Sequence, residues 1–301
     1  MDLGREPFII GLDYRLSTWR KLDHRALERC LTRGAAAGIK VLRLPLIWTE
    51  FQPDPHHFSD SCLRDLEAAM NTCAALRVRL LPGVFAASPD GPQFPSWATQ
   101  DPSLAVQGQL RMLDTLTSYF RAHRALLAWE IDVSSVSAIG LATEWRTELL
   151  PAMRKWDTRH HLALGLSDGN LLRGGRDVLE GLGTNTDFII MKWSGPLNLT
   201  ALVTALIWRL IERRVLFVMA HPPSSDHVMQ DSLRMLPGAG ALGVLSPVAG
   251  DAGDMPEFAW EGIERTVASG PSTVTEPRTI SLDPEDFYRD PETSWQTLCR
   301  G

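Results

Sequence analysis

Residues Ala125–Ser137 read ALLAWEIDVSSVS. The apolar first half of this run predicts a buried strand that stops near Asp132. Seven further apolar runs are spread along the chain, and most are solid rather than alternating, as expected for parallel strands buried on both faces. The eight predicted strands are Phe8–Asp13, Lys40–Leu46, Val78–Phe85, Leu126–Asp132, His161–Leu166, Asp187–Trp193, Val215–Met219 and Ala239–Ser246.

Helical patterns lie between these strands. Asp23, Ser59 and Asp101 are predicted N-cap residues, and the last of them precedes a proline at the first helical position. Eight regular β/α alternations predict an α/β fold, a single (β/α)8 TIM barrel over residues 1–270. A doubly wound sheet is the alternative, but it is less favoured because the chain has no Gly-rich phosphate loop. The predicted helices cover residues 23–37, 59–76, 101–123, 141–156, 197–213, 227–235 and 256–269, with a weaker one at 175–182.

Residues 271–301 form a predicted C-terminal extension with a different composition. The segment is rich in Pro, Ser, Thr and Asp, and it carries the aromatic residues Phe287, Tyr288 and Trp295. We expect it to dock on the barrel or to bind a protein partner. A merely flexible tail is the alternative, and the three aromatic residues count against it.

The overall composition narrows the classes of function. The chain has 301 residues, of which 44% are hydrophobic and 22% are charged, an ordinary globular composition. A net charge of -6 gives no reason to expect nucleic acid as a partner. No segment approaches the ~20 apolar residues that span a bilayer, and no signal peptide is visible, so we expect a cytoplasmic protein. The four cysteines lack metal-ligand spacing, and we expect reduced thiols, no metal and no cofactor.

Several segments match one family of barrel enzymes, in chain order. Gly11-Leu12-Asp13-Tyr14 is similar to a G-x-N-Y start, Gly38–Pro45 to G-x-x-x-V/L-R-x-P, and Asp187–Trp193 to D-F-I-S-x-H-x-Y. The run Ala125–Ser137 is similar to A-W-D/E-I/L-x-N-E-P. The chain thus resembles the clan A glycoside hydrolases, the cellulase and β-mannanase type of TIM barrel, over about Phe8–Ser269.

The resemblance fails at the positions that carry chemistry in this family. The acid/base Glu falls on Ser134, and the nucleophile Glu on the seventh strand falls on Met219, or on Ala220 with a one-residue slip. The Asn before the acid/base is Val133, and the His of the sixth strand is Lys192. A serine hydroxyl cannot protonate a glycosidic oxygen near neutral pH, and a retaining glycosidase needs two carboxyl groups. The resemblance therefore implies a barrel that has lost its catalytic residues.

Other carboxylates are fallback candidates for catalysis. Asp132 lies two residues before Ser134, and Glu50 lies on the loop after the second strand. For each, a structural role in a strand end or loop is the alternative. Glu130 is predicted to be a buried partner of Arg43 or Lys192, because barrel interiors neutralise charges by pairing.

Six residues are candidates for binding substrate at the predicted carboxyl ends of the strands. Trp48, Trp97 and Trp193 are eligible sugar platforms, since aromatic faces stack on pyranose rings, and His221 could equally be a packed wall residue. The full set is Arg43, Trp48, Trp97, Lys192, Trp193 and His221.

The sequence leaves three functions open. The leading hypothesis is a catalytically inactive pseudoenzyme that acts as a structural or protein-interaction subunit, through the barrel surface or residues 271–301, with residual carbohydrate binding. The alternative is a divergent glycosidase that hydrolyses β-linked glycosides with Asp132 or Glu50 as relocated carboxylates. The third is a sugar-binding module without turnover.

Overall fold

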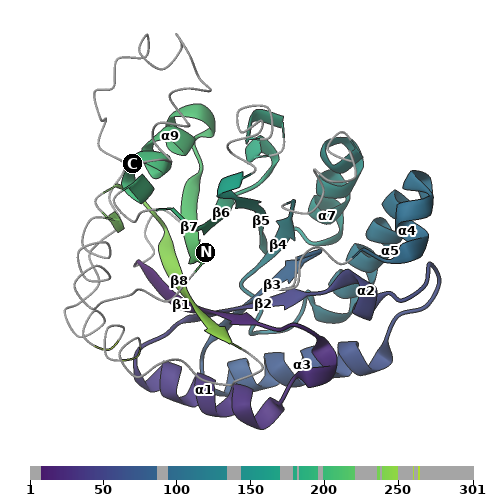
Figure 1. Ribbon diagram of the computed structural model, residues 1–301, viewed down its shortest axis with the longest axis horizontal. Coiled ribbons are helices and arrows are strands. Elements are labelled where there is room, and N and C mark those ends of the chain that lie inside the picture. Colours follow the sequence, from purple (N-terminus) through teal and green to yellow (C-terminus); the bar gives the residue numbers. More distant parts are fainter. Residues whose placement is uncertain are drawn as a thin grey trace.

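The computed structural model describes residues 8–86, 94–133, 144–169, 179–181, 183–195, 199–220, 236–237, 239–249, 260 and 264. Within them, eight parallel strands close into a barrel in which each strand pairs with the next and the last pairs with the first (Figure 1). The predicted (β/α)8 TIM barrel is confirmed. The strands are β1 (Ile9–Arg15), β2 (Val41–Leu46), β3 (Arg79–Val84), β4 (Ala128–Asp132), β5 (His161–Ser167), β6 (Phe188–Trp193), β7 (Arg214–Met219) and β8 (Gly243–Ala249).

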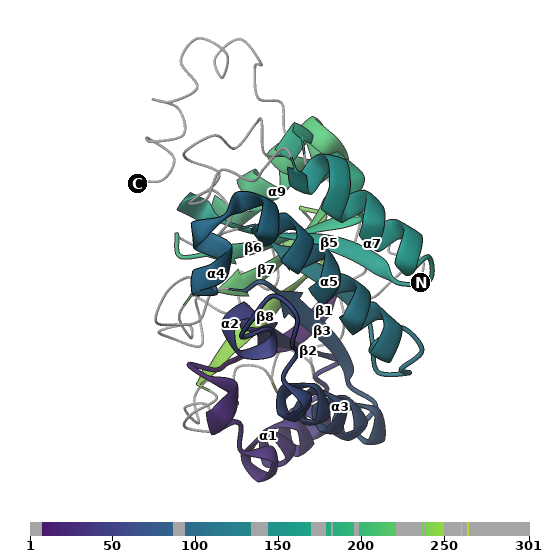
Figure 2. The same ribbon diagram turned by 90° about the vertical axis from the view of Figure 1, so that its right-hand side faces the viewer.

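The described helices lie on the outside of the barrel in the two views at right angles (Figures 1 and 2). The longest ones begin at the predicted N-caps: the carboxylates of Asp23 and Asp101 and the hydroxyl of Ser59 each accept a backbone N–H of the first turn. Those predicted at 227–235 and 256–269 lie wholly or largely outside the described residues. The helices are η1 (Trp19–Lys21), α1 (His24–Ala36), α2 (Trp48–Phe51), α3 (Asp60–Ala75), α4 (Ser96–Gln100), α5 (Pro102–Phe120), η3 (Trp145–Leu149), α7 (Leu150–Trp156), η4 (Gly183–Asn185) and α9 (Thr200–Ile211).

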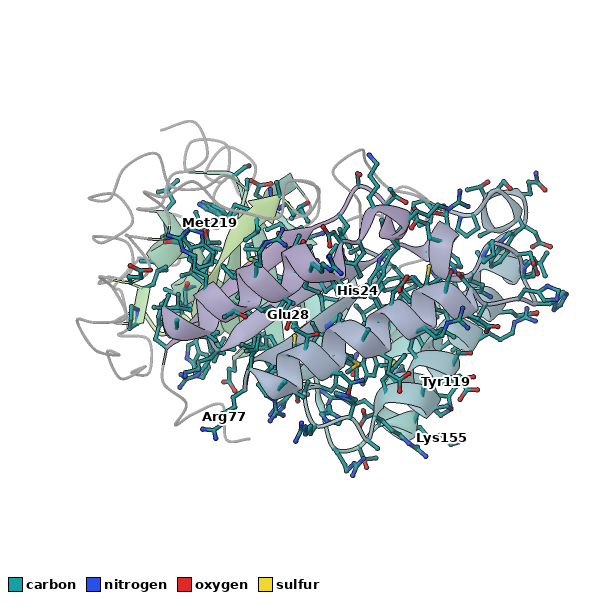
Figure 3. The ribbon with its side chains drawn as sticks, turned by 90° about the horizontal axis from the view of Figure 1, so that it is seen from below. His24, Glu28, Arg77, Tyr119, Lys155 and Met219 are labelled. Atoms are coloured by element: carbon teal, nitrogen blue, oxygen red, sulfur yellow. The ribbon has the colours of Figure 1, made fainter. Side chains whose placement is uncertain are left out.

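Helices α1 and α3 pack side by side on one flank of the barrel, as Figure 3 shows from below. They bury Leu27 and Leu31 of α1 and Leu66 and Met70 of α3, while Glu28 faces solvent. No helix among the described residues is long and apolar enough to cross a membrane.

The eighth strand differs from the prediction. It begins at Gly243, four residues after the predicted Ala239, and continues to Ala249. The cause is local, since residues 239–240 form a turn and Gly240 has a φ of 84°, which breaks an extended chain. Ala241 and Leu242 are buried but precede the strand, so an apolar run alone placed the start too early.

Side chains alternate along each strand between the barrel interior and the layer beneath the helices. Away from the carboxyl ends of the strands, the interior is filled by apolar residues of all eight strands or of the positions beside them: Ile9, Val41, Leu81, Leu127, Ala128, Ala163, Phe188, Ile190, Leu216, Val218, Leu242 and Leu245. Two residues further along the same faces, the chain places Arg43 after Val41, Glu130 after Ala128 and Lys192 after Ile190. The interior therefore changes from apolar to charged toward the carboxyl ends of the strands.

A carboxylate at the opposite end of the barrel stabilises the fold in a pH-dependent way. Asp187 accepts the backbone N–H of Leu162 at 2.8 Å and forms an ion pair with Arg154 at 2.8 Å. Although burial raises its pKa, hydrogen bonds from His161, Arg154 and Leu162 outweigh burial and hold the pKa far below its usual value.

We therefore expect Asp187→Asn to destabilise the protein most at neutral pH and progressively less as the pH falls below about 4. A lowered folded-state pKa stabilises the fold fully above the unfolded-state pKa of about 3.9, and this contribution is lost as the pH falls from that value toward the lower folded-state pKa. Urea unfolding of both proteins at pH 7 and pH 2 measures the difference. An equal difference at the two pH values would contradict the assignment.

Candidate functional site

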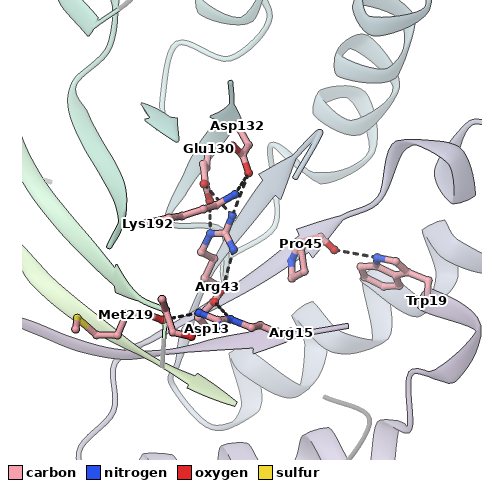
Figure 4. A network of polar contacts seen from close by, with 10 residues as sticks. Asp13, Arg15, Trp19, Arg43, Pro45, Glu130, Asp132, Lys192 and Met219 are labelled. Atoms are coloured by element: carbon pink, nitrogen blue, oxygen red, sulfur yellow. Dashed lines mark hydrogen bonds and ion pairs between the residues drawn. The ribbon is translucent and has the colours of Figure 1, made fainter. Parts of the chain in front are cut away.

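Arg43 of β2 lies at the centre of a charged network inside the barrel, toward the carboxyl ends of the strands (Figure 4). Its side chain is buried, and its Nε and Nη2 donate to the two carboxylate oxygens of Glu130 on β4, at 2.5 and 2.9 Å. Its Nη1 donates to Asp13 of β1 at 2.7 Å. The prediction that Glu130 is a buried partner of Arg43 is confirmed by this bidentate contact.

Lys192 of β6 joins the network through Asp132 of β4. The Lys192 Nζ contacts the Asp132 Oδ2, and the Arg43 Nη2 lies 3.7 Å from the same oxygen. The Asp132 side chain is fully buried, whereas 24% of the Lys192 side chain is exposed. On this side of the barrel the network therefore meets solvent at the lysine, while Asp132 itself has no exposed surface.

Arg15 extends the network to the seventh strand. Its Nε donates to the Asp13 Oδ2 at 2.8 Å, and its two Nη atoms donate to the backbone carbonyls of Ala220 and Met219 at 2.6 and 2.5 Å. Arginine offers five donors in a fixed fork, which suits this combination of one carboxylate and two carbonyls. The network thus links β1, β2, β4, β6 and β7 across the barrel.

The charges of the network balance, with three carboxylates, two guanidinium groups and one ammonium group. Burial would raise the pKa of Asp13, but Arg43 and Arg15 outweigh it and hold the pKa below its usual value. Burial likewise opposes the charge of Arg43, yet Glu130 and Asp13 hold its pKa well above the usual value. For Glu130, burial dominates over the attraction of Arg43 and raises the pKa. As the pH falls, Glu130 therefore takes up a proton before Asp13.

Two glycines on the strands beside β4 make room for the central ion pair. Gly83 of β3 is the register partner of Glu130, and a Cβ there would lie 2.9 Å from both the Arg43 Nη2 and the Glu130 Oε2. Gly165 of β5 is the register partner of Asp132, and a Cβ there would lie 2.4 Å from the Glu130 Oε1. The pair fits because both positions lack a side chain.

Glu50, a fallback catalytic residue, has a different setting. Its carboxylate accepts the backbone N–H of Trp19 at 2.6 Å and the hydroxyl of Thr18, so it holds the start of η1 after β1. Asp132, the other fallback, is engaged by Lys192 and Arg43. The structure brings Asp132 together with Arg43 and Lys192, and it gives Glu50 a separate set of partners.

Of the positions predicted to correspond to the family's two catalytic residues, the structure describes Met219 and Ala220. Met219 belongs to the apolar cluster between strands and helices, whereas Leu216 and Val218 of the same strand face the interior. By alternation, Ala220 is the next position on the interior side. The assignment of the family nucleophile position to Met219 or Ala220 stays a prediction, and neither residue carries a carboxylate. Ser134, His221 and the extension 271–301 lie outside the described residues.

The predicted aromatic platforms are largely covered. Trp48 is 1% exposed and donates its Nε1 to Gln52 at 2.9 Å, and Trp193 is 3% exposed and packs edge-on against Phe217. Trp97 is half-buried, with its ring centroid 5.4 Å from that of Trp48. A pyranose could stack on Trp48 or Trp193 only if neighbouring side chains moved, so the sugar-platform role stays a prediction.

Asp13 and Arg15 are members of the network that sequence reasoning did not select. Their signal was a charged residue at alternate positions of an otherwise apolar strand, GLDYR, which puts both charges on one face. Among the described residues, no group of three or more His, Cys, Asp or Glu side chains could hold a metal ion.

Comparison with solved structures finds barrels of similar fold. A GH5_18 protein from Streptomyces cattleya in complex with GlcNAc superposes with a TM-score of 0.72 at 14% identity, over 91% of this chain and 83% of that one. An exo-β-1,4-mannosidase from an Opitutaceae bacterium gives 0.70 at 16% identity, over 89% and 62%. A family 5 mannosidase from Rhizomucor miehei gives 0.66 at 11% identity, over 88% and 93%.

No protein-family model matches the sequence, and no curated protein matches it. The similarity is therefore one of fold: the chain shares its barrel fold with solved family 5 glycoside hydrolases.

Proposed function

We propose that this glycoside-hydrolase-like barrel does not hydrolyse glycosides and acts as a structural or protein-interaction subunit that keeps some affinity for carbohydrate. The observation that carries the proposal is the pairing of the three carboxylates of the charged network with cationic side chains. Asp13, Glu130 and Asp132 each contact a guanidinium or ammonium group. A retaining mechanism needs one carboxylic acid to give a proton and one free carboxylate to attack, about 5 Å apart.

The ion network also suits a scaffold better than a catalyst. A carboxylate bound by two N–H groups of a buried arginine is a poor nucleophile, because its lone pairs are occupied and its position is fixed. The hydrogen bonds and ion pairs of the whole network join five strands across the barrel, and this favours a rigid barrel. Rigid barrels present constant surfaces, and this supports a role in binding a partner.

Activity measurements test the loss of hydrolysis. We expect p-nitrophenyl β-mannoside, p-nitrophenyl β-glucoside and β-mannan to be hydrolysed no faster than in buffer, because losing both catalytic carboxylates removes the chemical step. The alternative, a divergent glycosidase using Asp132, predicts turnover that disappears in Asp132→Asn and persists in the exposed control Asp114→Asn. That pair of results would overturn the proposal.

Binding measurements test the remaining parts. Calorimetry with manno- and cello-oligosaccharides is expected to give heat without release of product. Co-purification of a stable partner that is lost on deleting residues 271–301, but kept after mutation of the barrel mouth, would assign the interaction to the extension. If neither sugar nor partner binds, the proposed role as a subunit fails.

A further inference from the structure

The charged network contains one nucleophile that solvent can reach. The guanidinium groups of Arg43 and Arg15 stay protonated in proteins and do not attack electrophiles. The three carboxylates are buried. Lys192 is different, because an amine is an effective nucleophile once it loses a proton, and a quarter of its side chain is exposed at the carboxyl end of β6.

Asp132 lies in contact with the Lys192 amine and can therefore act as its proton relay. Its Oδ2 contacts the Lys192 Nζ directly, and its side chain has no exposed surface. A proton can pass between the two groups in one step, without a water, and general acid–base transfer of this kind typically contributes ~10²–10⁴-fold to a rate. The register partner of Lys192 on β5 is the partly exposed Ser167.

We propose that Lys192 is a reactive amine that captures a small aldehyde as a covalent iminium, with Asp132 as the proton relay. The inference does not rest on the proposed function. A chain that hydrolysed glycosides could carry the same reactive lysine. Failure of the proposed function and failure of the Lys192 proposal are therefore separate results.

The step balances without an oxidant or a reductant. The ammonium group of Lys192 gives a proton to Asp132, and the resulting amine attacks the carbonyl carbon, forming the Nζ–C bond. A proton moves from nitrogen to the former carbonyl oxygen, and Asp132 returns its proton to that oxygen, which leaves as water. The product is a protonated imine, so the positive charge opposite Asp132 is the same before and after, and the charge balance of the network is kept.

Reductive trapping of the full-length protein tests the proposal. The protein is incubated with limiting glycolaldehyde and cyanoborohydride, which reduces an iminium to a stable secondary amine, and the labelled lysines are located by peptide mass spectrometry. The other lysines, Lys21, Lys40 and Lys155, are exposed and serve as internal controls, and Lys155 is seen at the surface in Figure 3. We expect Lys192 to be labelled at least ~10-fold faster than each of them, the relay being partly offset by burial.

Equal or slower labelling of Lys192 in the wild-type protein overturns the proposal, and this result needs no variant. Asp132→Asn is expected to reduce labelling of Lys192 to the level of the exposed lysines, while Asp114→Asn leaves it unchanged. Unchanged labelling in a folded Asp132→Asn protein would remove Asp132 from the step and overturn the relay. Lys192→Arg keeps a cation against Asp132 and should abolish the label at position 192 alone.

Discussion

We expect the Arg43→Met substitution to lower the free energy of unfolding by about 3–5 kcal/mol. This is the usual cost of removing one partner of a buried ion pair. Methionine fills much of the volume but donates no hydrogen bond. In this variant Asp13 still contacts Arg15, and Asp132 still contacts Lys192. Glu130 is fully buried and loses Arg43, its bidentate partner. The penalty comes from this uncompensated charge rather than from lost packing.

Equilibrium urea unfolding measures the effect, with Arg29→Met on the exposed face of α1 as the matched control. The control should change stability by less than about 0.5 kcal/mol, as surface substitutions do. Arg43→Lys should not rescue stability, because an ammonium group cannot make the bidentate contact. The double variant Arg43→Met/Glu130→Gln should regain part of the loss, since it removes the stranded charge. A single variant as stable as wild type would show that the network is not a source of stability.

The barrel could be predicted from sequence because burial on both faces leaves a strong signal. Solid apolar runs such as Val215–Met219 and capped helices such as the one after Asp23 recur with one spacing, and closure follows from eight repeats. The start of β8 was missed for a physical reason. Ala241 and Leu242 are as buried as strand residues, but they lie between the turn at residues 239–240 and the first strand residue, Gly243.

The site was predictable only in part. The pairing of Glu130 with Arg43 followed from the need to neutralise charge in a barrel interior. Its extension to Asp13 and Arg15 did not, because contacts between β1 and β7 depend on how the barrel closes rather than on any local pattern. The burial of Trp48 and Trp193 was missed for a related reason. A position at the end of a strand predicts at which end of the barrel a ring lies, but the packing of neighbouring side chains decides whether the face of the ring is exposed.

The second large effect concerns the space that the ion pair occupies. Gly165→Ala places a methyl group 2.4 Å from the Glu130 Oε1 and 3.1 Å from the Asp132 Cα. The first contact is far shorter than van der Waals separation, and Glu130 cannot retreat because Arg43 holds both of its oxygens. Overpacking of a rigid interior costs about 1–3 kcal/mol, and a displaced ion pair adds to that cost. We expect a loss of stability near the upper end of this range or beyond it.

Gly181→Ala provides the matched control, because a Cβ there would meet nothing within 4 Å. Urea unfolding of both variants separates the effect of local crowding from the general effect of replacing glycine, which is a few tenths to 1 kcal/mol and often stabilising. The mechanism can be tested further with Glu130→Gln, since a neutral side chain leaves Arg43 more easily. Gly165→Ala should then cost less in the Glu130→Gln background than in wild type. Equal costs in the two backgrounds would mean that crowding acts on the backbone of β4 and not through the ion pair, and the role of Gly165 in housing that pair would have to be abandoned.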